Sequence, residues 1–215
     1  MSVVCSILYG LSAVALLYAC TPPQKKAIRR IARPAMFVLG VLCYLFCVES
    51  VSVPVVIAFA FLCIGGILMF RQDRFVFMTA GYVCYSAGLV LYSFLCLRAV
   101  IGKPSFLFAA IAVLCYSVIL FYILYMLLPF IPKEMTIYAC ILTGAGALFS
   151  LCSLMLAFNG GSPGSSLVLI GSLFWLGMTV LHLHHRYKQH IPSGRFLITL
   201  LLEIAFTLII FGSVF

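Results

Sequence analysis

Acidic residues are scarce in this sequence. Aspartate and glutamate together number 4 among 215 residues, against 13 lysines and arginines, and charged residues make up only 8% of the chain. Apolar residues account for 66%, which excludes an ordinary soluble domain because too few polar side chains remain to cover a core. The formal charge of +9 resembles that of a nucleic-acid binder, but the cations lie in short links between apolar runs, where they set membrane topology. We therefore expect one polytopic transmembrane domain over residues 1–215, with membrane lipids as partners and no nucleic acid.

Clustered cysteine motifs are also missing. The chain has ten cysteines but no Cys-x-x-Cys motif and no Cys/His grouping with ligand spacing, although Cys43 and Cys47 stand one helical turn apart. Every cysteine lies in or at the end of an apolar run. This pattern favours unpaired cysteines that pack in the interior over disulfides or metal ligands, and we expect neither a metal nor a cofactor.

Long polar segments are absent, and eight apolar runs follow one another along the chain. Most of them approach the roughly 20 residues that an α-helix needs to cross a bilayer. Pro129 and Pro132 should end the fifth run early, and an uncharged flexible loop is expected over residues 159–166. The runs are Val3–Cys20, Pro34–Val48, the run from after Pro54 to Phe70, Phe75–Leu97, Ser105–Ile131, Met135–Phe158, Leu167–Leu183 and Phe196–Phe215.

The cations indicate how these runs are oriented. No cation precedes the first run and five follow it, the reverse of a cleaved secretory signal, so this run is expected to remain as a helix. If the link after it is cytoplasmic, inner loops hold eleven cations and outer loops hold two, Arg98 and Lys103. The sequence thus predicts an all-α integral membrane protein, a bundle of eight transmembrane helices with both termini outside. In a bacterium it would lie in the cytoplasmic membrane.

Small residues recur at helical spacing within the runs. In membranes such positions allow helices to approach closely, so we expect them to mark packing seams rather than ligand contacts. They are Gly65-Gly66, Gly81 with Gly88, Gly144 with Gly146, and Gly171 with Gly177.

The last two runs form a hairpin that contains the one acid deep in an apolar run, Glu203. Because no water reaches the hydrocarbon region, its carboxyl needs a partner or a proton there. Glu203 lies about 12 Å along its helix from Arg195, and Thr179 about 10 Å from Arg186 on the neighbouring helix, so the two can share one level. His182, one turn nearer the cytoplasm than Thr179, could act with Glu203 as an acid–base pair.

Several short motifs together resemble one family. Arg33-Pro34 opens the second run, Asp73-Arg74-Phe75 follows the third, and Tyr92 lies near the end of the fourth. Tyr138-Ala139 and the segment from Gly171 to Phe174 occupy matching places in later runs. In this order of segments the chain is similar to the YhhN-like lysoplasmalogenase family of eight-helix membrane proteins.

That resemblance implies hydrolysis of the vinyl-ether bond of a lysoplasmalogen, an ether lysophospholipid, to a fatty aldehyde and a glycerophospho-alcohol. The reaction needs a proton donor to the enol ether and a base that activates water. Where the family has a Gly-Asp, a histidine and a Ser-Asp, this chain has Gly65-Gly66, Gly88 or Leu89, and Met178-Thr179. The catalytic residues expected instead are Glu203, His182 and Asp73, and the substrate-binding residues expected are Tyr92, Tyr138 and Thr179.

Other interpretations of these residues stay open. Glu203 could be a protonated packing residue, and His182, His184 and His185 an interfacial polar cap. A His/His/Glu metal site is the less favoured option because no matched second pair exists. The chain could also be a catalytically silent lipid-binding protein or a small-solute carrier. A cytoplasm-facing cavity lined by Glu203 and His182 would favour the enzyme, and a solid bundle the silent protein.

Overall fold

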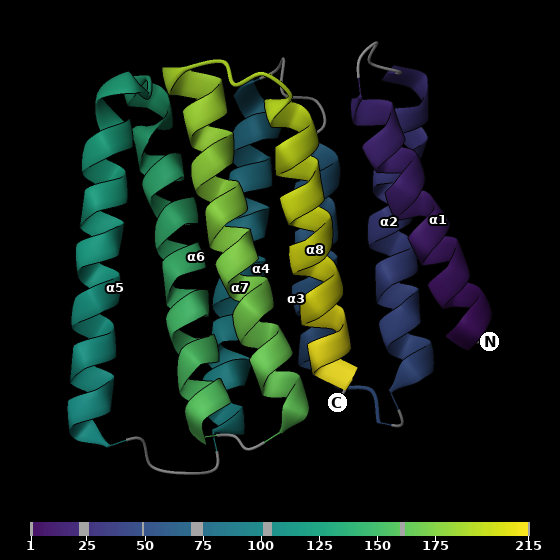
Figure 1. The fold of residues 1–215 in the computed structure, drawn as a ribbon, viewed down its shortest axis with the longest axis horizontal. Helices are drawn as coiled ribbons and strands as arrows, with labels where there is room; N and C mark the ends of the chain where they lie inside the picture. The colour runs from purple at the N-terminus through teal and green to yellow at the C-terminus, as the bar shows by residue number, and fades with distance from the viewer. Residues whose placement is uncertain are drawn as a thin grey trace.

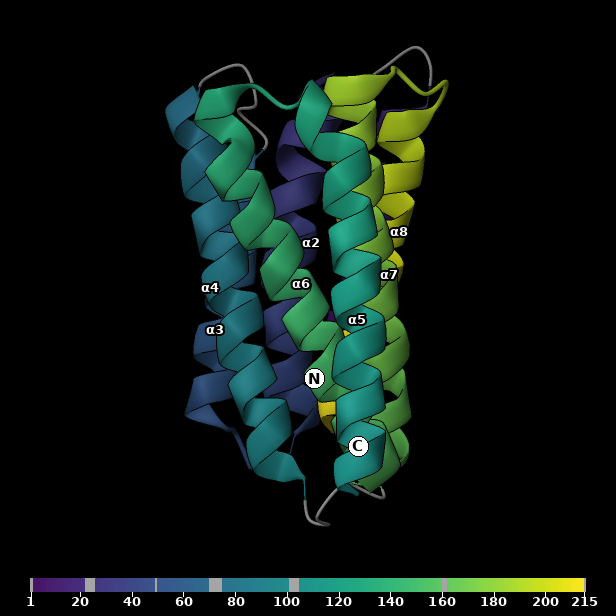
Figure 2. The ribbon, with the colours of Figure 1, turned by 90° about the vertical axis from the view of Figure 1, so that its left-hand side faces the viewer.

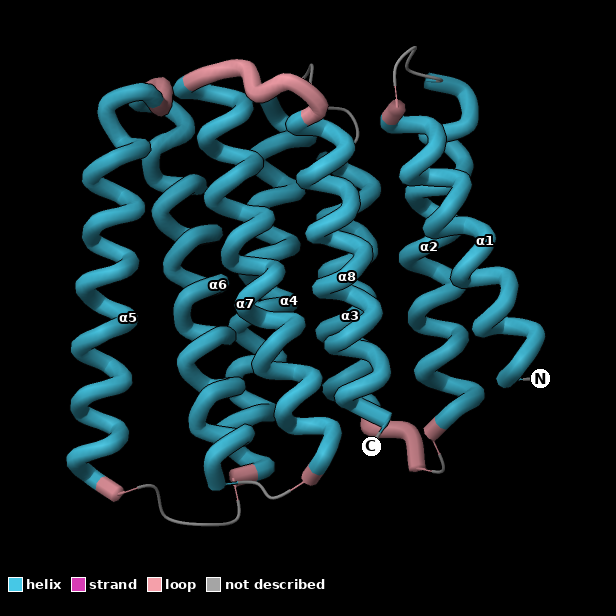
Figure 3. The backbone as a smooth tube through the Cα atoms, viewed as in Figure 1, coloured by secondary structure: helices cyan, strands magenta, loops and turns pink. Residues whose placement is uncertain are grey.

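The computed structural model describes residues 2–21, 26–48, 50–69, 75–100, 105–159 and 162–214. Within these residues the chain forms eight α-helices and no β-strand (Figures 1 and 3), so the all-helical prediction is confirmed. The helices are α1 (Ser2–Cys20), α2 (Lys26–Cys47), α3 (Val53–Leu68), α4 (Phe75–Ala99), α5 (Phe106–Leu127), α6 (Lys133–Asn159), α7 (Pro163–Leu183) and α8 (Gly194–Val214). A short 3-10 helix, η2 (Leu128–Phe130), follows α5, and a π-helix, η3 (His184–Lys188), follows α7.

Five described helical segments are long and apolar enough to cross a membrane, namely α4, α5 with η2, α6, α7 with η3, and α8. The first three helices contribute shorter apolar stretches, Ser6–Cys20, Ile31–Cys47 and Val53–Leu68. The helices run alongside one another, with α5 at one side and α1 and α2 at the other (Figure 1). In the same view α1 begins and α8 ends at the end of the bundle opposite to the link between α7 and α8.

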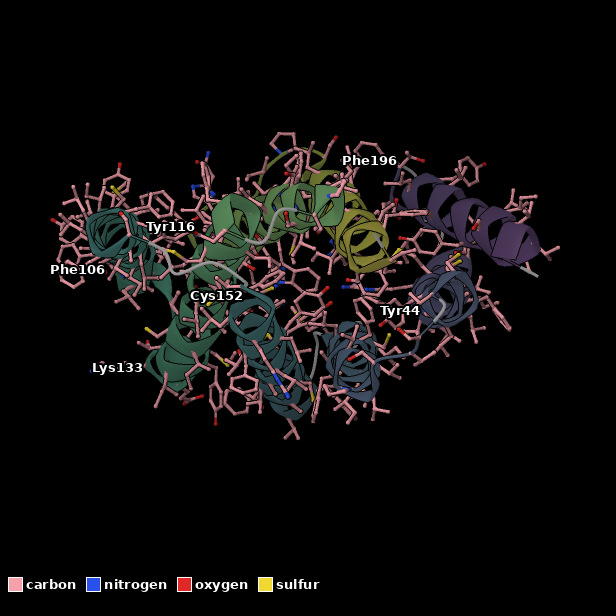
Figure 4. The ribbon with its side chains drawn as sticks, turned by 90° about the horizontal axis from the view of Figure 1, so that it is seen from below. Tyr44, Phe106, Tyr116, Lys133, Cys152 and Phe196 are labelled. Carbon is pink, nitrogen blue, oxygen red and sulfur yellow. The ribbon has the colours of Figure 1, made fainter. Side chains whose placement is uncertain are left out.

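The helix α5 stands at the edge of the bundle and contacts mainly α6, which is inclined to it (Figure 2). Phe106 projects away from the other helices, whereas Tyr116 lies toward α6 and its hydroxyl is 3.1 Å from the Ser150 hydroxyl (Figure 4). Most of the other large side chains of α5 are exposed. An apolar helix with this exposure is suited to face lipid on most of its surface.

Two boundaries differ from the sequence-based prediction. The second run was expected to open at Pro34, but α2 begins at Lys26 and contains this proline. A proline inside a helix costs about 3 kcal/mol or more. Met36 and Phe37 follow it and are fully buried, with the Phe37 ring 5.0 Å from that of Phe206, so packing holds the helix together across the proline.

The other boundary lies before α7. The segment 159–166 was expected to be a loop, yet α7 begins at Pro163. The Ser162 hydroxyl accepts a hydrogen bond from the Ser165 backbone N–H at 3.2 Å, and Pro163 occupies the first helical turn, where a missing N–H costs nothing. The loop prediction therefore missed a capped helix start.

Glycines bring two helix pairs into close contact. A Cβ atom at Gly171 of α7 would lie 3.0 Å from the Ala205 carbonyl oxygen of α8, and one at Gly88 of α4 would lie 3.0 Å from the Ala58 carbonyl oxygen of α3. The predicted seams are correct at these positions and wrong at Gly144 and Gly177, where a Cβ would meet nothing within 4 Å. Helical spacing alone does not tell which face of a helix meets a neighbour.

Candidate functional site

A cavity of about 290 Å³ lies at the end of the bundle that carries the link between α7 and α8. Its wall follows η3 and α7 from Arg186 back to Trp175, which is about 16 Å along the helix axis. Arg33 of α2, Tyr85 of α4 and Thr199 of α8 contribute to the other sides. The cavity is therefore enclosed by residues from both halves of the sequence.

The basic side chains that line this cavity are three arginines and three histidines. Arg33, Arg186 and Arg195 contribute guanidinium groups, and His182, His185 and His190 contribute imidazoles. Among the lining residues that the structure describes there is no acid. At an effective dielectric constant of 20, a guanidinium 4 Å away attracts an anion by about 4 kcal/mol and repels a cation equally. The cavity thus favours a ligand that carries negative charge.

The mouth of the cavity is shaped by the hairpin after η3. The Ile191 backbone N–H donates to His185 Nδ1 at 3.0 Å, and the rings of His185 and His190 lie 4.5 Å apart. Ser193 adopts a positive φ of 57°, which closes the hairpin just before α8. A Cβ atom at Gly194 would overlap the His185 ring, so glycine at this position allows the ring to sit against the start of α8.

His182 occupies the cavity wall one turn deeper than Arg186. Its side chain is buried, and its Nε2 atom shares a hydrogen bond of 3.1 Å with the Tyr82 hydroxyl of α4. The two rings meet edge to face, with centroids 6.0 Å apart. Arg186 and Arg33 are its main electrostatic neighbours. An imidazole held in this way can exchange a proton with a group in the cavity.

Three donors at the deep end of the cavity lack a hydrogen-bond acceptor. They are Trp175 Nε1, Tyr85 Oη and Arg33 Nε. The Trp175 and Tyr85 side chains are almost completely buried, with ring centroids 5.3 Å apart. The Arg33 guanidinium lies near the Tyr85 hydroxyl and acts on it both as a charge and as a side-chain hydrogen-bond donor. Burying an unpaired polar group costs about 1–3 kcal/mol, so a ligand with acceptor oxygens would gain by pairing with these donors.

Comparisons with known proteins do not identify the chain. It matches no family model, no curated protein and no solved structure. Its site is therefore interpreted from its own geometry. Within the described residues, no group of three His, Cys, Asp or Glu side chains is placed to hold a metal ion.

The structure brings only some of the predicted site residues together. His182 and Thr179 both line the cavity. Glu203 is buried but does not belong to the lining, and it lies on the side of α8 that faces Tyr9 of α1. Its Oε1 atom has no hydrogen-bond partner. Asp73 lies outside the described residues.

The two predicted tyrosines lie away from the cavity. Tyr92 is buried between the rings of Phe59 and Phe149, and its hydroxyl contacts the Ser213 hydroxyl near the end of α8. Tyr92 therefore lies toward the opposite end of the bundle from His182. Tyr138 of α6 is partly exposed and packs against the core without reaching the cavity.

Sequence reasoning missed the most informative residues of this site. Arg33 was assigned to the topology signal and to the Arg33-Pro34 motif, and neither assignment predicted that its side chain lines a cavity. Trp175 and Tyr85 lie in apolar runs, where an aromatic residue is ordinarily a packing residue. A usable signal existed in Trp175, since it is the only tryptophan of the chain and its N–H needs a partner when buried.

Proposed function

We propose that this chain is a multi-pass membrane protein that binds the phosphate headgroup of a single-chain phospholipid in the cavity between α2, α4, α7 and α8. The observation that carries this proposal is that three guanidinium groups and the unpaired Trp175 N–H line one cavity, with no acid among the described lining residues. Arginine suits phosphate because its planar fork offers two parallel hydrogen bonds. The resemblance to lysoplasmalogenases supports a lipid with one chain.

The proposal includes a topology in which all eight helices cross the membrane and both termini lie outside. The eleven-to-two distribution of cations supports it, and so does the placement of the α1 start and the α8 end at one end of the bundle (Figure 1). The cavity would then open toward the inner leaflet. A membrane-impermeant maleimide applied to intact cells should leave Ser193→Cys labelled no more than the wild type, and labelling from outside would overturn this orientation.

The single tryptophan provides a direct binding test. Trp175 lines the cavity, so its fluorescence in non-ionic detergent should change saturably as lysophospholipid is added. Arg33→Gln should weaken this binding at least about tenfold, because it removes a guanidinium that faces the ligand. Lys133→Gln is the matched control, since it removes an exposed cation at the same end of the bundle outside the cavity lining. No saturable change, or equal weakening by both variants, would overturn the proposal.

A second candidate function is the vinyl-ether hydrolysis implied by the family resemblance. His182 favours it, because an imidazole held by Tyr82 at the cavity wall can supply or remove a proton. A proton added to the β-carbon of the vinyl ether gives an oxocarbenium ion, water adds to the α-carbon and gives up a proton to the imidazole, and the resulting hemiacetal releases aldehyde and glycerophospho-alcohol. Purified protein incubated with 1-alkenyl lysophospholipid should release aldehyde, and His182→Gln should abolish release. Absence of aldehyde in the wild type would leave binding as the function.

A further inference from the structure

We infer that His182 is the residue by which the site recognises a single-chain phospholipid, because its Nδ1 atom accepts a hydrogen bond from the free hydroxyl next to the phosphate. This inference rests on the proposed function, since it names the feature of the same ligand that His182 contacts. Two observations lead to it. One is a chain of hydrogen bonds that fixes the imidazole proton on Nε2, and the other is the position of Nδ1 at the cavity.

Four side chains from α4, α7 and η3 form this chain of hydrogen bonds. His182 Nε2 lies 3.1 Å from the Tyr82 hydroxyl, which shares a further side-chain hydrogen bond with Tyr187. The Tyr187 hydroxyl donates to Met78 Sδ at 3.7 Å. His182, Tyr82 and Met78 are buried, and Tyr187 is partly buried against the core. The contacts cross from α7 to α4, on to η3 and back to α4, so they hold the His182 ring in one orientation.

The sulfur atom at the end of the chain sets the direction of each hydrogen bond. A thioether has no proton, so the Tyr187 O–H donates to Met78 and the Tyr187 oxygen accepts from Tyr82. The Tyr82 oxygen then accepts from His182, and Nε2 therefore carries the ring proton. The ring is buried in an apolar bundle, where a charged group is costly, so it is neutral and Nδ1 keeps its lone pair.

The Nδ1 atom of His182 faces the cavity. Among the described residues it has no hydrogen-bond partner, yet it does not belong to the buried unpaired atoms, in contrast to Nδ1 of His184. It therefore retains accessible surface. Tyr82 covers the Nε2 side of the ring and lies outside the cavity lining, whereas His182 is part of that lining. The accessible space beside Nδ1 is thus the cavity, and Nδ1 offers an acceptor to a ligand there.

A hydroxyl next to a phosphate matches this acceptor. Arg33 lines the same cavity and acts on His182 as a nearby charge, so one small ligand can reach both side chains. In a single-chain glycerophospholipid the free hydroxyl is on the carbon next to the one that bears the phosphate, and its O–H can donate to Nδ1. A second acyl chain converts this hydroxyl to an ester, which only accepts, and leaves Nδ1 facing another acceptor.

A pair of matched lipids tests the inference on the wild-type protein. The lipids are 1-alkyl-2-hydroxy-glycerophosphocholine and its 2-O-methyl ether, which share headgroup and chain and differ in one O–H. Each is titrated in non-ionic detergent with Trp175 emission as the signal. The hydroxy lipid should bind about tenfold more tightly, because the ether leaves Nδ1 unpaired. Equal affinities would overturn this inference and leave headgroup binding intact, whereas absence of binding by both lipids would overturn the proposed function.

Tyr187→Phe tests the hydrogen-bond chain itself. Without the Tyr187 oxygen, the Tyr82 O–H can donate to His182 Nε2, and the ring proton then moves to Nδ1. An Nδ1–H donates equally well to a hydroxyl or an ether oxygen, so both lipids should still bind but the preference for the hydroxy lipid should be lost. Tyr138→Phe is the matched control, since it removes a hydroxyl outside the cavity lining, and it should keep the preference. An unchanged preference in Tyr187→Phe would contradict the assignment of the proton.

The source of the ligand is tested by competition. Glycerol 3-phosphate carries the same phosphate and neighbouring hydroxyl without a hydrocarbon chain. Failure of a large excess of glycerol 3-phosphate to displace the hydroxy lipid supports a lipid ligand. Complete displacement at the lipid's own concentration would overturn that assignment in favour of a soluble phosphate ester.

Discussion

Removal of the Tyr85 hydroxyl should separate the stability of the protein from its ligand affinity. In the ligand-free protein the O–H of this buried side chain has no hydrogen-bond acceptor, and an unpaired buried donor costs about 1–3 kcal/mol. Tyr85→Phe deletes that cost and keeps the ring in its edge contact with Trp175. For a chain of this length, 1 kcal/mol corresponds to about 2–4 °C in Tm. We therefore expect Tyr85→Phe to raise the Tm by a few degrees while it weakens lysophosphatidylglycerol binding severalfold.

Tyr82→Phe is the matched control, because it makes the same change on the same helix at a hydroxyl that is hydrogen-bonded to His182. Removal of the Tyr82 hydroxyl leaves the His182 imidazole without this hydrogen-bond partner, so the Tm should fall by a few degrees. The assay is thermal unfolding of purified variants in non-ionic detergent, followed by circular dichroism with and without lipid. If Tyr85→Phe lowered the Tm as much as Tyr82→Phe, the Tyr85 O–H would have an acceptor within the protein and the reasoning would fail.

Three other variants follow from the contacts of single residues. Gly171→Ala should lower the Tm, because its Cβ would press on the α8 backbone, whereas Gly177→Ala in the same helix meets nothing within 4 Å and should change it little; equal effects would refute the close α7–α8 contact. Glu203→Gln should keep lipid affinity within about twofold and leave the Tm equal or higher, since the carboxyl is buried with one unpaired oxygen and lies off the cavity; loss of binding or of aldehyde release would restore Glu203 to the site. Gly194→Ala should weaken lipid binding by displacing the His185 ring at the mouth, as measured by Trp175 emission, and unchanged affinity would show that this ring does not shape the site.

The helical fold could be predicted because each helix coincides with an apolar run, and hydrophobicity decides this directly. The start of α2 could not be predicted from the sequence. Proline ordinarily breaks or begins a helix, but here the burial of Met36 and Phe37 outweighs that effect of Pro34. That burial depends on side chains such as Phe206 from the far end of the chain. Local sequence does not contain this information.

The candidate site was predictable in part. The depth argument placed Thr179 and His182 near each other on α7, and both line the cavity. It also placed Glu203 at their level, but depth along a helix says nothing about rotation around it. Leu202 lines the cavity, and Glu203, about 100° further around the helix, belongs to the side facing α1. Arg33 reaches the same space from α2, a tertiary relation that charge patterns do not reveal.

The most direct test of headgroup binding is native mass spectrometry of the protein released from micelles that contain lysophosphatidylglycerol. The wild-type chain should retain one lipid molecule, Lys133→Gln should retain it as well, and Arg33→Gln should lose it. Equal retention by all three proteins, or no retained lipid on the wild type, would contradict a headgroup site built around Arg33.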